Sequence, residues 1–492
     1  MAVLGIFLIS TIVEAKMPND PDYPKQQAMW QQIGAEKAWD YTTGSKQVTV
    51  AIIDTGADIW HDDLKSNVWT NPYEIPDNGY DDDGNGFIDD VYGWNFIENN
   101  NDVRTSVFDN ADDPEAIRHG TIIAGLVGAV GNNNKSGTGL NWQVKIMPLR
   151  AIASDGSGSY TQVAKAVLYA MNNGADVIGL SVVGMEDDVN LKQILREAYD
   201  KGIVIVAAAG NDQRSGNGNL SNTRHYPVCM DADSADNWII GVSAVDENDQ
   251  LSKFANYGSC VDLVAPGQNI FSIQRYSPVY GYNEEFGGPW QGTSFSVPLV
   301  AGAAALLKSI RPDWSAKDII NSLLKNSDDI QSKNPNFTNE LGFGRLNIGK
   351  AVENAIVGSQ TTYSLPKDIY YFKNNIIFTK QDSDKYFFAD TGEASLLTLV
   401  AARSFNNKLD EVFALVNRKK YYYVQFFTEL GYKWKEVAIP TKDYSTKKIP
   451  VGIKVVTIDN QRKVQIEFIE KIVKKGKKTI IKNIFKQYNW LD

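Results

Sequence analysis

The chain has 492 residues, and its 43% hydrophobic and 11% aromatic content is typical of a globular protein with a sizeable core. Its length predicts about two to four domains. Residues 360–492 hold 24 Lys and Arg against 14 Asp and Glu, a net charge of +10, whereas residues 1–359 hold 25 against 45, a net charge of −20. This change predicts a boundary near residue 358, and the acidic part argues against nucleic acid as its partner.

Residues 1–15 are predicted to be a signal peptide. Residues 1–13 form an apolar run, which is shorter than the roughly 20 residues that span a bilayer. Val13 and Ala15 are small residues where cleavage requires them. The usual basic start is missing, which a truncated beginning of the gene would explain. This interpretation predicts a secreted or cell-surface protein.

The two cysteines, Cys229 and Cys260, are too few for a disulfide scaffold. One bridge between them and two separate buried thiols remain equally good interpretations. The sequence alone does not decide between them.

Residues 16–358 alternate short apolar, β-branched runs with helical patterns. The predicted strands are 48–53, 144–148, 177–181, 203–209 and 239–245, and the predicted helices are 161–173, 191–201, 294–308 and 316–325. Such alternation predicts an α/β domain in which helices cover a mostly parallel sheet on both faces. Ligands of such sheets bind beyond the carboxyl ends of the strands, so residues directly after these runs are functional candidates.

Residues 359–492 have a different pattern. Aromatic and β-branched residues dominate 370–379, 411–427 and 452–469, and each of these segments is interrupted by a polar turn. This pattern is typical of successive hairpins and predicts a C-terminal all-β accessory domain.

Four residues stand in settings that suit peptide hydrolysis by a serine. This chemistry needs a hydroxyl, an imidazole that takes its proton, a carboxylate that orients the imidazole, and donors for the developing oxyanion. Asp54 ends a predicted strand, His119 precedes Gly-Thr, Ser294 opens a buried helix, and Asn211 follows another strand. Each alone has an ordinary interpretation: a loop-capping carboxylate, a structural histidine, an N-cap serine or a strand-end amide.

Together the motifs Asp-Thr-Gly, His-Gly-Thr, Ala-Gly-Asn and Gly-Thr-Ser, in this order, resemble those of the subtilisin-like serine peptidases, the subtilases. The resemblance covers roughly residues 20–355. It implies a three-layer α/β/α subtilisin-like domain, endopeptidase activity on polypeptide substrates, and Asp54, His119 and Ser294 as the catalytic triad. It also implies that Asn211 and the Ser294 N–H stabilise the oxyanion.

Two segments resemble the substrate-binding strands of that family, although ordinary surface segments are the alternative. They would bind an extended peptide through main-chain hydrogen bonds. Val183 stands where the family commonly has glycine, which predicts a narrower specificity pocket. The residues are Gly156, Ser157 and Gly158 on one side of the peptide, and Ser181, Val182, Val183 and Gly184 on the other.

An acidic segment has the spacing of an EF-hand calcium loop, with a glycine at its sixth position. The predicted Ca²⁺ ligands are Asp81, Asp83, Asn85, Asp89 and the carbonyl of Phe87. The glutamate expected at position 12 is missing, and a solvated acidic turn is the alternative. The predicted role is structural. By family resemblance, Asp63 and Asn133 would contribute to a second site.

The sequence also leaves open an alternative to a secreted endopeptidase. It is a catalytically inactive subtilase-fold protein that binds partners at a surface. The +10 charge of residues 360–492 predicts binding of the accessory domain to an anionic surface, with a solvated β domain or docking on the acidic domain as alternatives.

Overall fold

The computed structural model describes residues 16–105 and 114–359, together with the strands between residues 370 and 489. The predicted signal peptide, residues 1–15, lies outside the described residues. The chain divides into two compact units, residues 1–357 and 358–492.

A seven-stranded sheet with the order β2-β3-β1-β4-β5-β6-β7 forms the centre of the first unit. All neighbouring strands are parallel. The central strand β1 ends at Asp54, which pairs with Arg150 at the end of β3. The strands are β1 (Gly44–Asp54), β2 (Trp94–Asn95), β3 (Gln143–Arg150), β4 (Val177–Leu180), β5 (Val204–Ala208), β6 (Ile240–Val245) and β7 (Leu263–Pro266).

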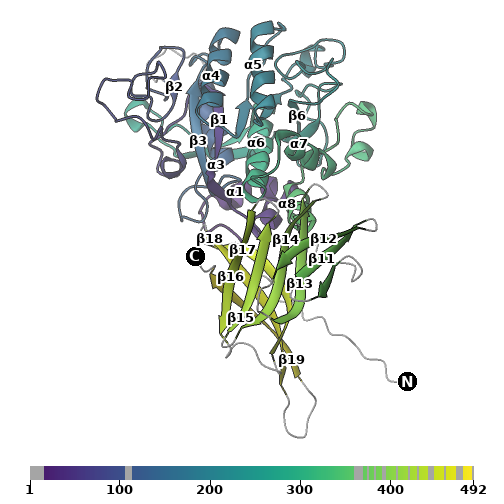
Figure 1. Cartoon of the computed structure of the whole chain (residues 1–492). Coiled ribbons are helices and arrows are strands. Elements are labelled where there is room, and N and C mark those ends of the chain that lie inside the picture. Colours follow the sequence, from purple (N-terminus) through teal and green to yellow (C-terminus); the bar gives the residue numbers. More distant parts are fainter. Residues whose placement is uncertain are drawn as a thin grey trace. The chain divides into compact units, whose positions relative to one another are not determined.

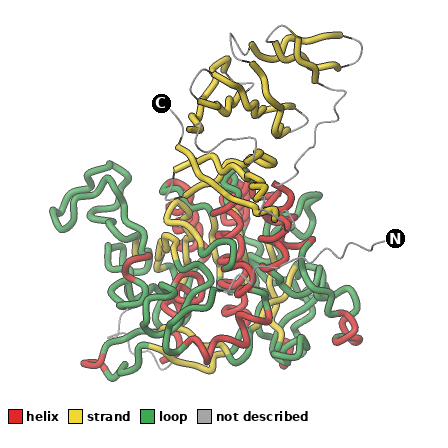
Figure 2. Tube along the Cα trace, turned by 90° about the horizontal axis from the view of Figure 1, so that it is seen from below, coloured by secondary structure: helices red, strands yellow, loops and turns green. Residues whose placement is uncertain are grey.

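Helices cover both faces of this sheet (Figure 1). Val50 and Ile52 of β1 belong to the hydrophobic cluster that contains α3 and α6, whereas Ala51 and Ile53 belong to the cluster of α4 and α5. This alternation builds three layers, which loops and turns connect (green in Figure 2). The helices are α1 (Tyr23–Gln32), α2 (Ala35–Trp39), α3 (Pro114–Gly128), α4 (Tyr160–Asn172), α5 (Val189–Asp200), α6 (Thr293–Ile310), α7 (Ala316–Lys325) and α8 (Ile348–Ser359).

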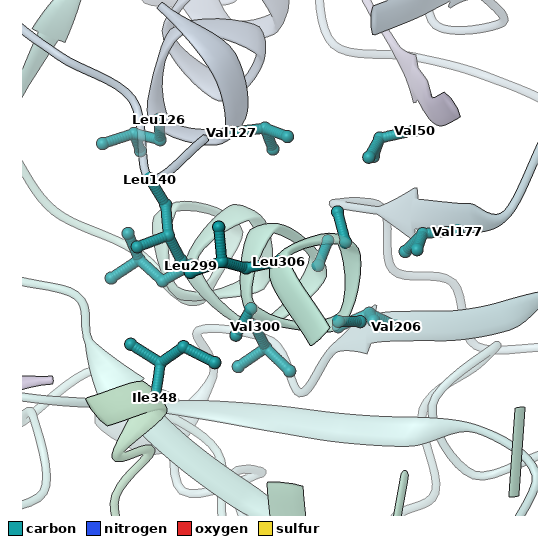
Figure 3. Packing of buried hydrophobic residues seen from close by; sticks show 14 of the residues in the cluster. Val50, Leu126, Val127, Leu140, Val177, Val206, Leu299, Val300, Leu306 and Ile348 are labelled. Carbon is teal, nitrogen blue, oxygen red and sulfur yellow. The ribbon is translucent and has the colours of Figure 1, made fainter. Parts of the chain in front are cut away.

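Helix α6 runs through the larger hydrophobic cluster. Its Leu299, Val300 and Leu306 lie among side chains from α3, from three sheet strands and from Ile348 (Figure 3). Within the described residues, α6 alone is long and apolar enough to cross a membrane, but 78% of that segment is buried inside the fold. It is therefore a core helix.

The predicted strands and helices of the first unit are present, with ends that differ by a few residues. Helix 316–325 has the predicted bounds, and the predicted helix 294–308 is α6, Thr293–Ile310. A further helix, α3, begins at Pro114 and contains His119. The structure also joins Cys229 to Cys260 in a disulfide, which decides the alternative that the sequence left open.

A short antiparallel sheet of β8 (Ile270–Ile273) and β9 (Phe286–Trp290) completes the first unit. The second unit contains three antiparallel sheets. Their strands are β10 (Tyr370–Lys373), β11 (Ile376–Gln381) and β12 (Asp384–Asp390); β13 (Ser395–Phe405), β14 (Lys408–Arg418), β15 (Tyr421–Thr428) and β16 (Gly431–Pro440); β17 (Lys448–Ile458), β18 (Gln461–Ile472) and β19 (Ile480–Asn489).

Candidate active site

A buried carboxylate and a histidine meet at the carboxyl end of β1. The Nδ1 atom of His119 lies 2.7 Å from Oδ1 of Asp54. The Asp54 side chain is 2% exposed and that of His119 is 19% exposed. The Thr55 N–H also donates to Asp54 Oδ1 (2.7 Å). The carboxylate therefore holds the imidazole in one orientation.

The two motifs that carry these side chains pack directly on each other. A Cβ at position 120 would lie 2.1 Å from the Gly56 carbonyl oxygen, so only glycine lets α3 approach β1 this closely. The Gly120 N–H donates to Thr55 Oγ1 (3.2 Å), and the Asp58 N–H donates to Thr121 Oγ1 (3.0 Å). These contacts explain why Asp-Thr-Gly and His-Gly-Thr occur as sets.

Ser294 is the second residue of α6, and its neighbour Phe295 packs on the histidine. The ring centroids of His119 and Phe295 are 5.5 Å apart. Pro298 lies four residues after Ser294 and has no N–H, so it cannot donate to the Ser294 carbonyl within the helix. The Ser181 hydroxyl donates to that carbonyl instead (3.0 Å), and the Ser294 hydroxyl donates to the Ser181 carbonyl (3.4 Å). Ser181 therefore ties the end of β4 to the start of α6.

The Asn211 amide is held in one orientation by the residue before Ser294. Both the N–H and the hydroxyl of Thr293 donate to Asn211 Oδ1, at 3.0 Å and 3.1 Å. The amide NH₂ must therefore point away from Thr293. Asn211 is exposed, and a Cβ placed on Gly292 would lie 3.7 Å from its Nδ2. Its donor thus lies beside the start of α6.

A pocket of about 410 Å³ lies beside Asp54 and His119. Both predicted substrate-binding segments line it, although Ser157 does not, and Tyr160 and Leu191 add apolar surface. The backbone of Gly184 already pairs with Tyr226, at 2.8 Å and 2.9 Å. That pairing leaves the main chain of 181–183 as the part that can bind a peptide. The lining residues from the two segments are Gly156, Gly158, Ser181, Val182, Val183 and Gly184.

The acidic loop between β1 and β2 arranges its side chains differently from a simple EF-hand. The Asp81 carboxylate accepts the N–H groups of Asn85 and Gly86 (3.0 and 2.8 Å). Asp89 accepts the N–H groups of Asn78 and Gly79 (3.0 and 2.9 Å). The ligand atoms that converge instead belong to Glu74, Asp83 and Asp90, all within 4.8 Å of one another.

This carboxylate cluster has the features of a cation site. Asp90 is fully buried and Glu74 is 7% exposed, and Glu74 Oε2 is buried without a hydrogen-bond partner among the described residues. Burial raises the pKa of Asp90, although hydrogen bonds from Tyr169, Asn71 and Asn85 oppose this. Hard oxygen ligands around an unbalanced negative charge fit Ca²⁺.

A second pair of buried carboxylates lies near the predicted second site. Asp63 is fully buried, and burial raises its pKa to about 8. Its Oδ1 accepts the Asn133 amide (2.6 Å), and its Oδ2 is buried without a partner among the described residues. Asp20 accepts the N–H of Asn133 (2.9 Å) and is 3% exposed. The sequence analysis missed Asp20.

The missed residues lie outside the patterns that suggested the two sites, and Asp20 stands 113 residues before its partner Asn133. Glu74 and Asp90 lie outside the nine-residue pattern that suggested the calcium loop. Pro298, four residues after Ser294, was a readable sign that the Ser294 carbonyl needs a donor from elsewhere.

Known proteins resemble a large part of this chain. The model of the Subtilase family matches residues 45–344. Thermitase from Thermoactinomyces vulgaris is 33% identical over 336 residues, which are 68% of this chain and 99% of thermitase. The halolysin-like extracellular serine protease Nep from Natrialba magadii is 29% identical over 70% of this chain and 54% of Nep.

A solved structure of a protease from Pseudoalteromonas arctica is 27% identical, with a TM-score of 0.53. It covers 69% of this chain and 100% of its own. The family match, the thermitase alignment and this structure each cover between 60% and 70% of the chain. The chain therefore belongs to the subtilase family of serine-type endopeptidases.

Proposed function

We propose that the chain is a secreted serine endopeptidase that cleaves peptide bonds through Asp54, His119 and Ser294. The observation that carries the proposal is the 2.7 Å hydrogen bond between buried Asp54 and His119. The start of α6, where Ser294 lies, packs against that histidine through Phe295.

The Ser294 hydroxyl attacks the peptide carbonyl while its proton passes to Nε2 of His119. Asp54 keeps Nδ1 protonated and stabilises the imidazolium. The imidazolium then protonates the leaving amine, and an acyl-enzyme on Ser294 remains. Water, deprotonated by His119, hydrolyses this ester and returns the serine hydroxyl. The bond from Ser294 to the Ser181 carbonyl is long, 3.4 Å, so this hydroxyl breaks a weak contact to react.

Asn211 Nδ2 and the Ser294 N–H stabilise the oxyanion in this mechanism. Support comes from the fixed amide of Asn211, whose Oδ1 accepts two bonds from Thr293. An oriented donor needs no reorganisation when charge develops on the substrate oxygen. Residues 156–158 and 181–183 bind the extended peptide between them, and the pocket beside His119 accepts a side chain that precedes the scissile bond.

A fluorophosphonate probe tests the proposal against the alternative of a catalytically inactive surface binding protein. The wild-type chain should be labelled on Ser294, and Ser294→Ala should abolish labelling without changing the melting temperature. Ser296→Ala is the matched control, since Ser296 lies two positions further along α6 and its hydroxyl donates to buried carbonyls. An unlabelled wild-type chain would favour the binding protein.

We also propose structural calcium at the acidic loop and at Asp63. At the loop, the sequence pattern points to Asp81, Asp83, Asn85, Phe87 and Asp89, whereas the convergent oxygens favour Glu74, Asp83 and Asp90. At the second site, Asp20, Asp63 and Asn133 would hold the ion. Bound calcium would supply the positive charge that these buried carboxylates lack.

Secretion and an all-β accessory domain of residues 359–492 complete the proposal. Nep, one of the relatives, is extracellular by name. The +10 charge of residues 360–492 supports binding to an anionic surface. Retention of the Ser294→Ala chain on a polyanion column should fall with salt and should be lost in the same variant ending at residue 359. Equal retention of both chains would contradict this role.

A further inference from the structure

Arg118, the residue directly before His119, lies between two aromatic rings. Its guanidinium carbon is 5.2 Å from the ring centroid of Tyr282 and 6.0 Å from that of Trp290. Among the side chains of residues 16–105 and 116–356 it has no ion pair, and its Nε is buried without a partner there. Glu284 lies two residues after Tyr282, yet it is not paired with Arg118 either. Arg118 is half-buried and pairs with no carboxylate among the described side chains, so a carboxylate from outside can bind it.

Arg118 lies outside the pocket beside His119. The residues that line that pocket do not include Arg118, Tyr282 or Trp290, and from α3 they include only Ala116 and His119. Adjacent residues of a helix point about 100° apart, so Arg118 and His119 face different directions from α3. Arg118 instead contacts the end of β9, and Trp290 is four residues before Ser294.

An extended substrate that fills the pocket must leave it on the far side of His119 and Ser294. Arg118 directly precedes His119 and Trp290 is four residues before Ser294, so the surface made by Arg118, Tyr282 and Trp290 borders the two catalytic positions outside the pocket. The two rings hold the guanidinium group in place by cation–π contacts. The side chain therefore loses less conformational entropy when it binds a ligand. Its edge keeps a pair of parallel N–H donors, which match a carboxylate.

We infer that Arg118 determines specificity on the leaving-group side of the cleft, where it binds a carboxylate side chain of the substrate. The carboxylate belongs to the first or second residue after the scissile bond. This inference rests on the proposed endopeptidase function and adds a class of preferred substrate to it, namely peptides that are acidic directly after the cleaved bond.

Three fluorogenic peptides test it, identical before the scissile bond and carrying Asp, Ala or Lys at both positions after it. The full-length protein should cleave the Asp peptide with a kcat/KM about tenfold above that of the Lys peptide. Arg118→Lys should keep this preference in weaker form, Arg118→Gln should bring the ratio near one, and Arg118→Glu should reverse it. The ratio is informative even if a variant disturbs neighbouring His119, because that loss affects all three peptides.

Arg196 provides the matched control. Its guanidinium also lies over two rings, Tyr199 at 5.3 Å and Trp238 at 6.0 Å, but it is bonded to Asp200 and does not line the pocket. Arg196→Gln should leave the ratio unchanged. The wild-type preference should also shrink as salt rises from low to high concentration.

The outcomes separate the two proposals. Cleavage of the Ala peptide without any preference for Asp would overturn the role of Arg118 and leave the endopeptidase intact. A preference for Asp that survives in Arg118→Gln would also overturn it. Failure to cleave any of the three peptides would count against the proposed function itself.

Discussion

Two regions of this protein bury carboxylates, and they balance the negative charge in different ways. At the end of β1, Asp54 is 2% exposed and its carboxylate is hydrogen-bonded to the imidazole of His119. In the loop between β1 and β2, Glu74 and Asp90 are equally buried, but their partners are amides, a tyrosine hydroxyl and backbone N–H groups. None of the contacts of Glu74, Asp83 and Asp90 in the described residues supplies a positive charge.

The two regions also differ in the structural elements on which their residues lie. Asp54, His119 and Ser294 stand on β1, α3 and α6, whose positions are set by the core and do not depend on the site. Glu74, Asp83 and Asp90 stand in an irregular loop, outside the helices and strands that form the core. We therefore expect changes at the first region to affect catalysis and changes at the second to affect stability.

Among variants of the two regions, Asp54→Asn should cause the largest loss of kcat. The amide keeps the size of the carboxylate but cannot hold His119 in the required tautomer, so kcat should fall about 10⁴-fold. The melting temperature should change by only a few degrees, because the core elements remain packed. Steady-state kinetics and calorimetry on the same preparations measure both. A variant that unfolds but retains its activity per folded molecule would contradict the assignment.

Asn211→Ala should lower kcat about 10²- to 10³-fold with little change in KM. The cause is the loss of one donor to the oxyanion, which forms only in the transition state. Asn211→Asp is a useful companion, since its carboxylate can still accept from Thr293 but cannot donate. Both variants should lose kcat, and a loss confined to KM would point to ground-state binding instead.

Calcium removal should lower the melting temperature by roughly 5–10 °C, since a ligand at 100 times its Kd stabilises the fold by about 2.7 kcal/mol. Peptidase activity below that temperature should stay largely unchanged. Glu74→Gln should weaken the response to calcium, because it removes one buried charge and keeps an acceptor for the Asp82 N–H. If the EDTA-treated protein had the same melting curve as the calcium-saturated protein, the proposed structural calcium sites would be contradicted.

Asp81→Asn and Asp89→Asn decide between the two ligand sets in the loop. If Glu74, Asp83 and Asp90 hold the ion, these two variants should keep most of the calcium response. A loss as large as that of Glu74→Gln would restore the set suggested by the sequence spacing.

The contrast between the regions also explains what could be predicted from sequence. Apolar runs and helical periodicity located β1, β4 and α7, because burial imposes that pattern on residues close in the chain. The strand β2 has only two residues, Trp94–Asn95, and no periodicity could reveal it. The motifs around Asp54, His119 and Ser294 were readable because close packing demands glycine at fixed places. Glu74 and Asp90 were not readable, since loop closure brings them together.

The two histidines His119 and His61 extend the comparison to pH. His119 lies against a carboxylate, whereas buried His61 accepts the Asp63 N–H at Nδ1 (3.1 Å) and bonds the Glu285 carbonyl through Nε2 (3.0 Å). Burial lowers the pKa of His61 from 6.5, and a protonated Nδ1 could no longer accept. Since the folded pKa lies below the unfolded one, its stabilisation is complete above pH 6.5 and is lost as pH falls through the folded pKa.

In calcium-saturated buffer, wild-type unfolding free energy should therefore fall between pH 6.5 and 5 by at most about 1.4 kcal/mol per pH unit from this group. His61→Gln should be less stable at pH 8 but should show a flatter curve over that interval, because glutamine does not titrate. Denaturant unfolding at several pH values measures both slopes. If the unfolding free energies of the two proteins fall in parallel as the pH is lowered, His61 does not cause the pH dependence. The loss of stability between pH 6.5 and 5 would then have to come from carboxylates.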